Sequence, residues 1–183
     1  MTQLSAIAIP NAATARVKRW SKGLSLIEAA MVLALSAVVV AGTMFYYQSA
    51  SQNQKTEASQ SELMALNTIV RSLYGSRSNF SGVTAQQVIS TNHLPPSLVD
   101  KTNNVIKNPF GGTVDVGEDA SGQRFYMTFD KIPKGPCIKI GVTRIGSSVY
   151  ELSINGHYMG DGPGQALTYC TSQDDNVIKW IMR

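Results

Sequence analysis

Few side chains in this sequence could do chemistry together. His93 and His157 are the two histidines, and they lie far apart in the chain, so no Ser/His/Asp or Cys/His arrangement can be proposed from them. Asp115, Glu118 and Asp119 could suggest a calcium site, but the segment lacks the regular alternation of oxygen ligands that such loops show. A solvated turn explains these acids better. The sequence therefore predicts no enzyme, no cofactor and no metal site.

Cys137 and Cys170 are the only cysteines in the sequence. Zinc is a poor match, because neither histidine lies at ligand spacing from a cysteine. If this region lies outside the cytoplasm, a disulfide is favoured over free thiols. Closing a loop of about 34 residues would contribute roughly 3 to 4 kcal/mol in the chain-entropy treatment. Two thiols buried as small apolar groups are the alternative.

Glu28 is the most informative acid, because it stands at the head of an apolar run. A carboxylate in a membrane-spanning helix costs about 2.5 to 3.5 kcal/mol at the helix centre, and less near an end, so it needs a partner. Ser25 lies three residues earlier, which matches a capping box in which the glutamate reaches back to the helix N-terminus. The spacing alone predicts this cap.

The residues on either side of Glu28 form a membrane-targeting pattern. From Ala29 to Tyr47 nineteen residues carry no charge, and at roughly 1.5 Å per residue they span about 28 Å against a hydrocarbon core of about 30 Å. Basic residues precede this run at positions 16, 18, 19 and 22. The positive-inside rule places residues 1–22 in the cytoplasm and the rest outside. A secretory signal peptide at residues 7–15 is the main alternative, but no basic segment precedes that stretch.

The charge balance argues against a nucleic-acid partner. The chain has 16 basic and 12 acidic residues, a net charge of +4 and a pI near 9.1. Four of the basic residues precede position 24, so the remainder carries 12 of each sign and is neutral. A DNA-binding stripe is therefore not expected. The apolar content of 43% is too high for a disordered chain and too low for a polytopic membrane protein.

One long helix, from about residue 24 to residue 74, is the main predicted element. Neither proline nor glycine interrupts residues 43–74, and Gly75 provides a C-terminal stop. The second half is amphipathic, because apolar residues recur at spacings of three and four and predict one buried face. The members of that face are Leu63, Leu66, Val70 and Leu73. Gly42 is the weakest point, where either local unwinding or close packing of helices is expected.

The rest of the chain predicts an antiparallel sheet, and hence an α+β fold. Residues 76–108 have loop composition, with short helical turns at 83–90 and a bend at Pro95-Pro96. Residues 112–116 and 124–129 alternate and predict a hairpin, and 149–154 and 177–182 predict two more strands. Residues 137–145 are rich in β-branched side chains and locally resemble a strand, whereas residues 160–164 have the composition of a loop.

The segment Lys22-Gly-Leu-Ser-Leu-Ile-Glu28 resembles the processing site of type IV prepilins. That motif places a glycine before the cleavage point, an apolar residue after it and a glutamate at the fifth mature position, which are here Gly23, Leu24 and Glu28. Further features resemble the type IVb subgroup: a long leader, a leucine at the mature N-terminus, the segments 41–51 and 108–112, and the C-terminal cysteine pair.

The resemblance implies a role for each of these residues. Prepilin peptidase would cleave after Gly23, where a side chain would obstruct the approach of the backbone, and Leu24 would be N-methylated. The carboxylate of Glu28 would pair with the new amino group of Leu24 on a neighbouring subunit. The family fold places a long helix on an antiparallel sheet, with a disulfide closing the C-terminal region and a helix at 137–145. The expected domains are a leader (1–23), a transmembrane and filament-core half-helix (24–50) and a globular domain outside the membrane (51–183).

The function implied is that of a major pilin. The precursor would be held in the inner membrane, and the assembly machinery would polymerise it into surface filaments for adhesion to host or bacterial cells, autoaggregation or bundle formation. A thin conjugative pilus and a type II secretion pseudopilin are alternatives within the same architecture. A binding or enzymatic domain with a simple membrane anchor is the alternative from another class.

Overall fold

The structure is a computed structural model that describes residues 25–183 except 76, 78, 144–146 and 161–163. The predicted leader 1–23, with Gly23, and the predicted mature terminus Leu24 therefore lie outside the described residues. The chain divides into two compact units, with the boundary between Thr43 and Met44. The second unit contains the sheet, the disulfide and the amphipathic part of the long helix.

Helix α1 runs from Leu26 to Tyr74 over 49 residues. It is continuous through Gly42, so the single chain shows no unwinding there, while the behaviour of Gly42 in a filament stays a prediction. The helix ends where the sequence predicts. A Cβ atom at Gly75 would lie 2.7 Å from the carbonyl oxygen of Arg71, so only glycine allows the backbone to turn this tightly at the helix end.

The amphipathic part of α1 buries one face against the rest of the second unit. Its buried residues are Thr56, Ser59, Glu62, Leu63, Leu66, Ile69, Val70 and Tyr74. The prediction that Leu73 belongs to this face is wrong, because its side chain is 40% exposed. Tyr74, four residues after Val70, takes the place instead, and its hydroxyl donates to the side chain of Gln87 at 2.8 Å. At 3.6 residues per turn, three turns from Leu63 bring the buried face to position 74 rather than 73.

The sheet has seven antiparallel strands in the order β1-β2-β3-β4-β7-β5-β6. The strands are β1 (Val99–Asp100), β2 (Val105–Lys107), β3 (Thr113–Glu118), β4 (Phe125–Ile132), β5 (Val149–Ile154), β6 (His157–Tyr158) and β7 (Asn176–Met182). The predicted hairpin is confirmed as β3 and β4, and the two further predicted strands are β5 and β7. The sequence does not predict β1, β2 and β6, because strands of two or three residues show too little alternation.

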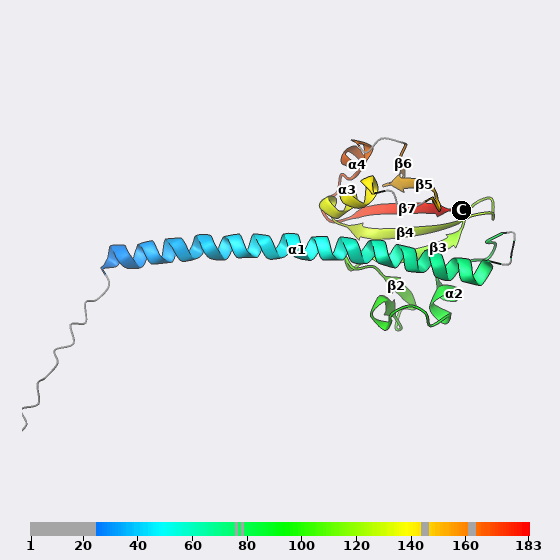
Figure 1. Ribbon diagram of the computed structural model, residues 1–183, viewed down its shortest axis with the longest axis horizontal. Coiled ribbons are helices and arrows are strands. Elements are labelled where there is room, and N and C mark those ends of the chain that lie inside the picture. Colours follow the sequence, from blue (N-terminus) through cyan, green and yellow to red (C-terminus); the bar gives the residue numbers. More distant parts are fainter. Residues whose placement is uncertain (1–24, 76, 78, 144–146, 161–163) are drawn as a thin grey trace, which may run out of the picture. The chain divides into compact units, whose positions relative to one another are not determined.

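The core lies between α1 and one face of the sheet (Figure 1). On β4, Phe125, Met127 and Phe129 are fully buried. Each pairs with a buried residue of β7 across the ladder, namely Met182, Trp180 and Ile178. The alternate residues of both strands point to the opposite face, called the outer face below. This regular alternation is what makes both strands visible in the sequence.

The described part of the second unit also contains four short helical elements: α2 (Ala85–Ser90), the 3-10 helix η1 (Pro96–Leu98), α3 (Lys134–Val142) and α4 (Gly164–Tyr169). The helical turns expected at 83–90 are confirmed as α2, while Pro96 opens η1 instead of a plain bend. Residues 137–142 are helical, as the family fold implies, and the strand-like local composition is overridden. The sequence does not predict helix α4, because the glycines before it indicate only a loop.

Candidate assembly site

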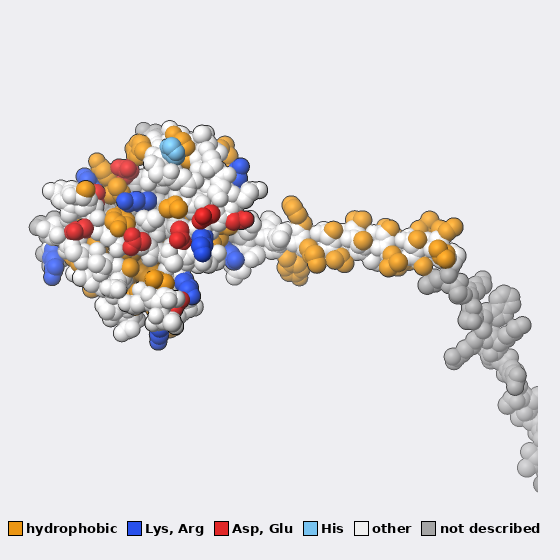
Figure 2. Space-filling view, turned by 180° about the vertical axis from the view of Figure 1, so that it is seen from behind, with side chains coloured by type: hydrophobic (Ala, Val, Ile, Leu, Met, Phe, Trp, Pro, Cys, Tyr) orange, Lys and Arg blue, Asp and Glu red, His pale blue; other side chains and the backbone are white. Residues whose placement is uncertain are grey.

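The first half of α1 exposes almost every apolar side chain it carries. The large exposed residues are Leu26, Ile27, Met31, Val32, Leu33, Leu35, Val38, Val39, Val40, Met44, Phe45, Tyr46 and Tyr47. Figure 2 shows these hydrophobic side chains along the helix, and from Ala29 to Tyr47 the sequence has no lysine, arginine or acid among them. The helix is long and apolar enough to cross a membrane. An apolar surface of this kind is expected to be buried against lipid or other helices, because removing each leucine or valine from water is favourable by roughly 1.5 to 3 kcal/mol.

Two hydroxyl groups in this half of α1 are satisfied by the helix itself. Ser36 donates to the carbonyl oxygen of Val32 at 2.7 Å, and Thr43 donates to that of Val40 at 2.9 Å. These bonds remove the cost of placing a hydroxyl in an apolar medium. The helix surface can therefore pack against lipid or against other helices without an unpaired polar group at these two positions.

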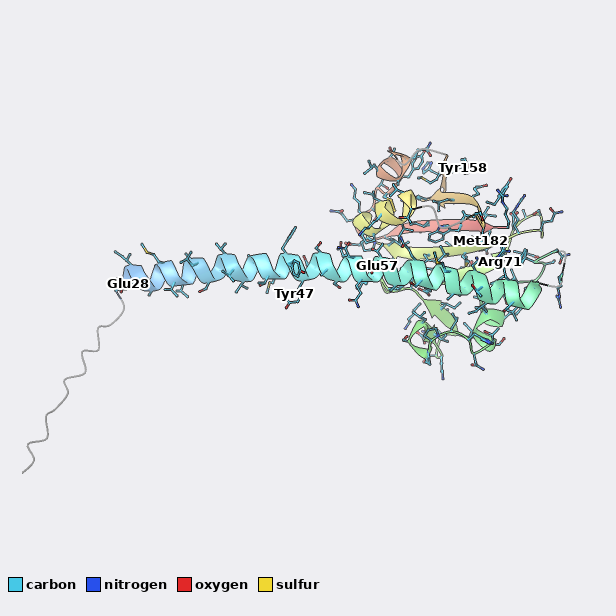
Figure 3. The ribbon with its side chains drawn as sticks, viewed as in Figure 1. Glu28, Tyr47, Glu57, Arg71, Tyr158 and Met182 are labelled. Atoms are coloured by element: carbon cyan, nitrogen blue, oxygen red, sulfur yellow. A yellow bond between two sulfur atoms is a disulfide. The ribbon has the colours of Figure 1, made fainter. Side chains whose placement is uncertain are left out.

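Glu28 and Ser25 form the capping box that their spacing predicts. Figure 3 labels Glu28 near the start of α1. The backbone N–H of Ser25 donates to Oε2 of Glu28 at 2.9 Å, and the backbone N–H of Glu28 donates to Oγ of Ser25 at 3.2 Å. Both bonds satisfy donors at the helix start. The second role implied for Glu28 involves Leu24, which lies outside the described residues, so that role stays a prediction.

The Cys137–Cys170 disulfide is present and fully buried. It ties α3 to the residue that follows α4, across a sequence separation of 33. The two helices also pack closely, because a Cβ atom at Gly141 would lie 2.8 Å from Cδ1 of Ile154 and 3.0 Å from Cβ of Ala166. The predicted disulfide is therefore confirmed, and Gly141 is a packing glycine that the sequence does not reveal.

Two asparagines hold the ends of this disulfide-closed region to the sheet. The amide of Asn176 donates to the carbonyl oxygens of Ile132 and Ser172 at 2.8 and 2.7 Å. The amide of Asn155 donates to the carbonyl oxygen of Tyr169 at 2.8 Å and to Oδ1 of Asn176 at 3.0 Å. The Asn155-Gly156 turn is visible in the sequence, but nothing there distinguishes Asn176 from a surface residue.

The remaining polar candidates serve separate local contacts. His157 stacks on Tyr169, with ring centroids 4.8 Å apart. The side chain of Asp119 accepts from the backbone of Ala120 and from Ser121 inside its own turn. Glu118 accepts from the backbone N–H of Gly82 at 2.8 Å. Within the described residues no group of three or more histidine, cysteine or acidic side chains is placed to hold a metal ion.

Asp115 belongs to the outer face of the sheet, where it accepts a hydrogen bond from the Tyr126 hydroxyl at 3.1 Å. Burial raises the pKa of Tyr126, and the carboxylate of Asp115 raises it further. Lys179 lies over the same ring at 4.2 Å from its centroid. The ammonium group therefore offsets part of the negative charge that faces the phenol. The three acids considered for calcium thus have different partners and do not converge.

The arrangement of α1 on the sheet matches a known class of proteins. A crystal structure of TcpA, a type IV pilin from Vibrio cholerae El Tor biotype, superposes with a TM-score of 0.51 at 12% identity. The match covers 70% of this chain and 98% of that one. The fold is that of a type IV pilin: a long N-terminal helix, an antiparallel sheet and a C-terminal region closed by a disulfide.

Sequence comparison narrows the class. The sequence model of the Bundlin family matches residues 48–176. A protein of Escherichia coli O127:H6, strain E2348/69, is 40% identical over 91% of this chain and 96% of its own length. A protein of Escherichia coli O111:H- is 39% identical over 75% of this chain and 72% of its own length. Both relatives bear the name "Major structural subunit of bundle-forming pilus". This chain belongs to the bundlin family.

Proposed function

We propose that this chain is the major structural subunit of a type IVb pilus and polymerises into a surface filament. The observation that carries the proposal is the relative that is 40% identical along 96% of its length and is named for that role. The exposed apolar half of α1 supports it, because such a surface suits both a membrane before assembly and a helical core afterwards.

The proposed maturation removes residues 1–23 and leaves an N-methylated Leu24 as the first residue. The support is the order of the sequence: a basic flank, then Gly23, then an apolar helix with Glu28 at the fifth mature position. The precursor would sit in the inner membrane with its N-terminus in the cytoplasm. Prepilin peptidase and the pilus assembly machinery are the partners that this route requires.

The proposed assembly contact joins Glu28 to the amino group of Leu24 on a neighbouring subunit. In an apolar core an unpaired carboxylate or ammonium costs several kcal/mol, so each charge needs the other. The capping box does not compete with this pair, because the box uses Oε2 of Glu28 and a carboxylate has several acceptor positions. The apolar half of α1, proposed as residues 24–50, would then form the core of the filament.

The globular domain, proposed as residues 51–183, would form the outer surface of the filament. Bundle formation and adhesion to host or bacterial cells are the activities that we propose for this surface. Figure 2 shows acidic and basic side chains interspersed over one face of the globular domain. The mature chain carries equal numbers of both signs. Filaments with such surfaces can approach one another without strong net repulsion.

The test is electron microscopy of a sheared cell-surface fraction, with immunogold labelling of this chain. Long labelled fibres are the expected result. Short labelled fibres confined to the periplasm would instead indicate a pseudopilin, and labelling of membranes alone would indicate an anchored domain. A strain that lacks the chain serves as the control for fibres made by other pilins.

A further inference from the structure

A buried acid on α1 has no hydrogen-bond partner among the described residues. Glu62 is 4% exposed, and neither of its carboxyl oxygens has a hydrogen-bond partner. The hydroxyl of Ser59, one turn earlier on the same face, is also buried without a partner. Thr56 on this face differs, because its hydroxyl donates to the carbonyl oxygen of Gln52 at 2.7 Å. Glu62 and Ser59 therefore form a pair of buried, unsatisfied polar groups that no hydrogen bond joins to each other.

The surroundings of this pair are apolar. The next buried residues of α1 are Leu63 and Leu66, and the sheet presents Trp180 and other apolar side chains on the same side. An ionised carboxylate at this place would lose its hydration without gaining a compensating charge or donor. A buried charge of this kind is neutralised in most proteins rather than tolerated.

The charged side chains on the elements around Glu62 either bond to other residues or lie on the surface. Those that are exposed or lie on the outer face of the sheet are Lys55, Glu57, Lys131, Lys134, Glu151 and Lys179. Those that bond to a partner within the domain are Arg71, Lys107, Asp115, Glu118, Asp130 and Lys139. None of these contacts involves Glu62, so the described residues supply no counter-ion.

The described residues show no space for water beside Ser59 and no metal site at Glu62. The narrow crevice beside Ser59, lined by Gln60, Leu63, Ile140 and Trp180, is too small for a water molecule. Among the described residues Glu62 belongs to no group of metal-ligating side chains. A proton can neutralise the carboxylate without any counter-ion. Protonation also removes the charge that an apolar core cannot solvate.

We propose that the folded subunit binds one proton at Glu62, between α1 and the sheet, and that the unfolded chain releases this proton at neutral pH. Burial raises the pKa of Glu62 to about 8, in agreement with the geometry. Protonation is then part of the packing of α1 on the sheet. The proposed proton site lies within the folded domain, so its protonation does not depend on filament formation.

The sign of the pH effect follows from the two states. Below an ordinary glutamate pKa of about 4.3 both states hold the proton, and the full stability is present. Between there and pH about 8 the folded state holds one proton more than the unfolded state. The unfolding equilibrium constant should therefore rise by up to tenfold per pH unit in this window. The stabilisation that the proton provides is lost as the pH passes through the pKa of Glu62 in the folded state.

Infrared spectroscopy of the full chain in detergent micelles tests the proton directly. The carbonyl stretch of a protonated carboxyl group should be present at pH 7, fade as the pH rises past about 8, and be absent in Glu62→Gln. Glu57→Gln is the matched control, because Glu57 is an exposed acid on the same helix (Figure 3) and should leave the band unchanged. An identical band in wild type and Glu62→Gln would overturn the proposal.

A second measurement covers the case in which the variant does not fold. Refolding of the wild-type chain from denaturant into weakly buffered solution at pH 7 should take up a proton, detected with an indicator dye. Asp100 and Tyr126 do not interfere, because hydrogen bonds hold the pKa of Asp100 well below its usual range and the pKa of Tyr126 is raised further above neutrality. Refolding without proton uptake at pH 7 would refute the assignment.

Discussion

The carboxylate of Glu28 can serve a cap and an assembly contact, and substitution separates the two. Glutamine keeps the reach and the acceptor oxygen of the capping box and removes only the charge. If the partner is the Leu24 amine of a neighbouring subunit, Glu28→Gln leaves that amine unpaired in an apolar core, at a cost on the order of a few kcal/mol for each subunit added. We expect processed chain in the membrane and few or no filaments, measured by filament yield beside an immunoblot of membranes.

Ser25→Ala is the matching control for Glu28→Gln. It removes the other half of the capping box, at about 1 kcal/mol, and keeps the charge of Glu28. Filaments should therefore form in Ser25→Ala. Normal filament yield in Glu28→Gln, or loss of filaments in both variants, would contradict charge pairing and favour the cap as the role of Glu28.

Asn155 tests the polar network at the end of the disulfide-closed region. Its amide nitrogen faces two acceptors, the carbonyl oxygen of Tyr169 and Oδ1 of Asn176. In Asn155→Asp a carboxylate oxygen would face both, so we expect a loss of about 1 to 3 kcal/mol in the free energy of unfolding. Denaturant unfolding measures the loss. Asn92→Asp is the control, because Asn92 also has a positive φ of 54° but is exposed. Equal stability of the two variants would show that the network contributes little.

The residues that can be identified from the sequence share one property: their type is unusual for their surroundings. Glu28 is an acid before an apolar run, and Cys137 and Cys170 are the only cysteines. Asn176 and Glu62 give no such signal, because polar residues in polar stretches are ordinary. Their burial depends on segments distant in sequence, since Asn176 bonds to Ile132 across 44 positions. Such roles arise only when the chain has folded.

Among the elements, α1, the β3–β4 hairpin, β5 and β7 can be predicted because their periodicity extends over many residues. The 49-residue helix and the eight-residue strand β4 each repeat their pattern several times. The edge strands β1 and β6 have two residues each, so hydrogen bonding to β2 and β5 defines them rather than local sequence. Helix α3 is implied by the family resemblance, against its β-branched composition, and the close packing of α3 on α4 explains why tertiary contact prevails.

The disulfide should matter most for the region that contains α3 and α4. Cys137→Ser should lower the stability of the folded domain by roughly 3 to 4 kcal/mol in the chain-entropy treatment, because the loop is then open in the unfolded state. We expect lower subunit abundance with unchanged membrane insertion, measured by immunoblots of fractionated cells. Cys170→Ser should have the same effect as the double variant. Additive losses from the two substitutions, or free thiols in intact filaments, would contradict this account.

At the scale of the whole molecule, removal of the proposed leader would change the net charge of the chain. Residues 1–23 contain four basic residues and no acid, so their removal converts a chain of net charge +4 into one with 12 charges of each sign. Basic side chains keep the N-terminus on the cytoplasmic side. The same side chains could not enter an apolar filament core, where each would cost several kcal/mol without a partner. Cleavage is therefore expected to be a condition for assembly rather than a later trimming step.

Mass spectrometry of filament subunits tests this order of events. The mature chain should begin at Leu24 with one methyl group on its amine and lack residues 1–23. Gly23→Val should block cleavage, because a branched side chain obstructs the approach of the backbone to the peptidase. The uncleaved chain should then accumulate in the membrane without filaments, although its folded domain and disulfide form normally. Gly42→Val serves as the control, since a Cβ atom added at that glycine would meet no other atom within 4 Å and should leave cleavage intact. Filament subunits that begin at Met1 or near Ala15, or filaments built from uncleaved Gly23→Val chains, would contradict the proposed maturation.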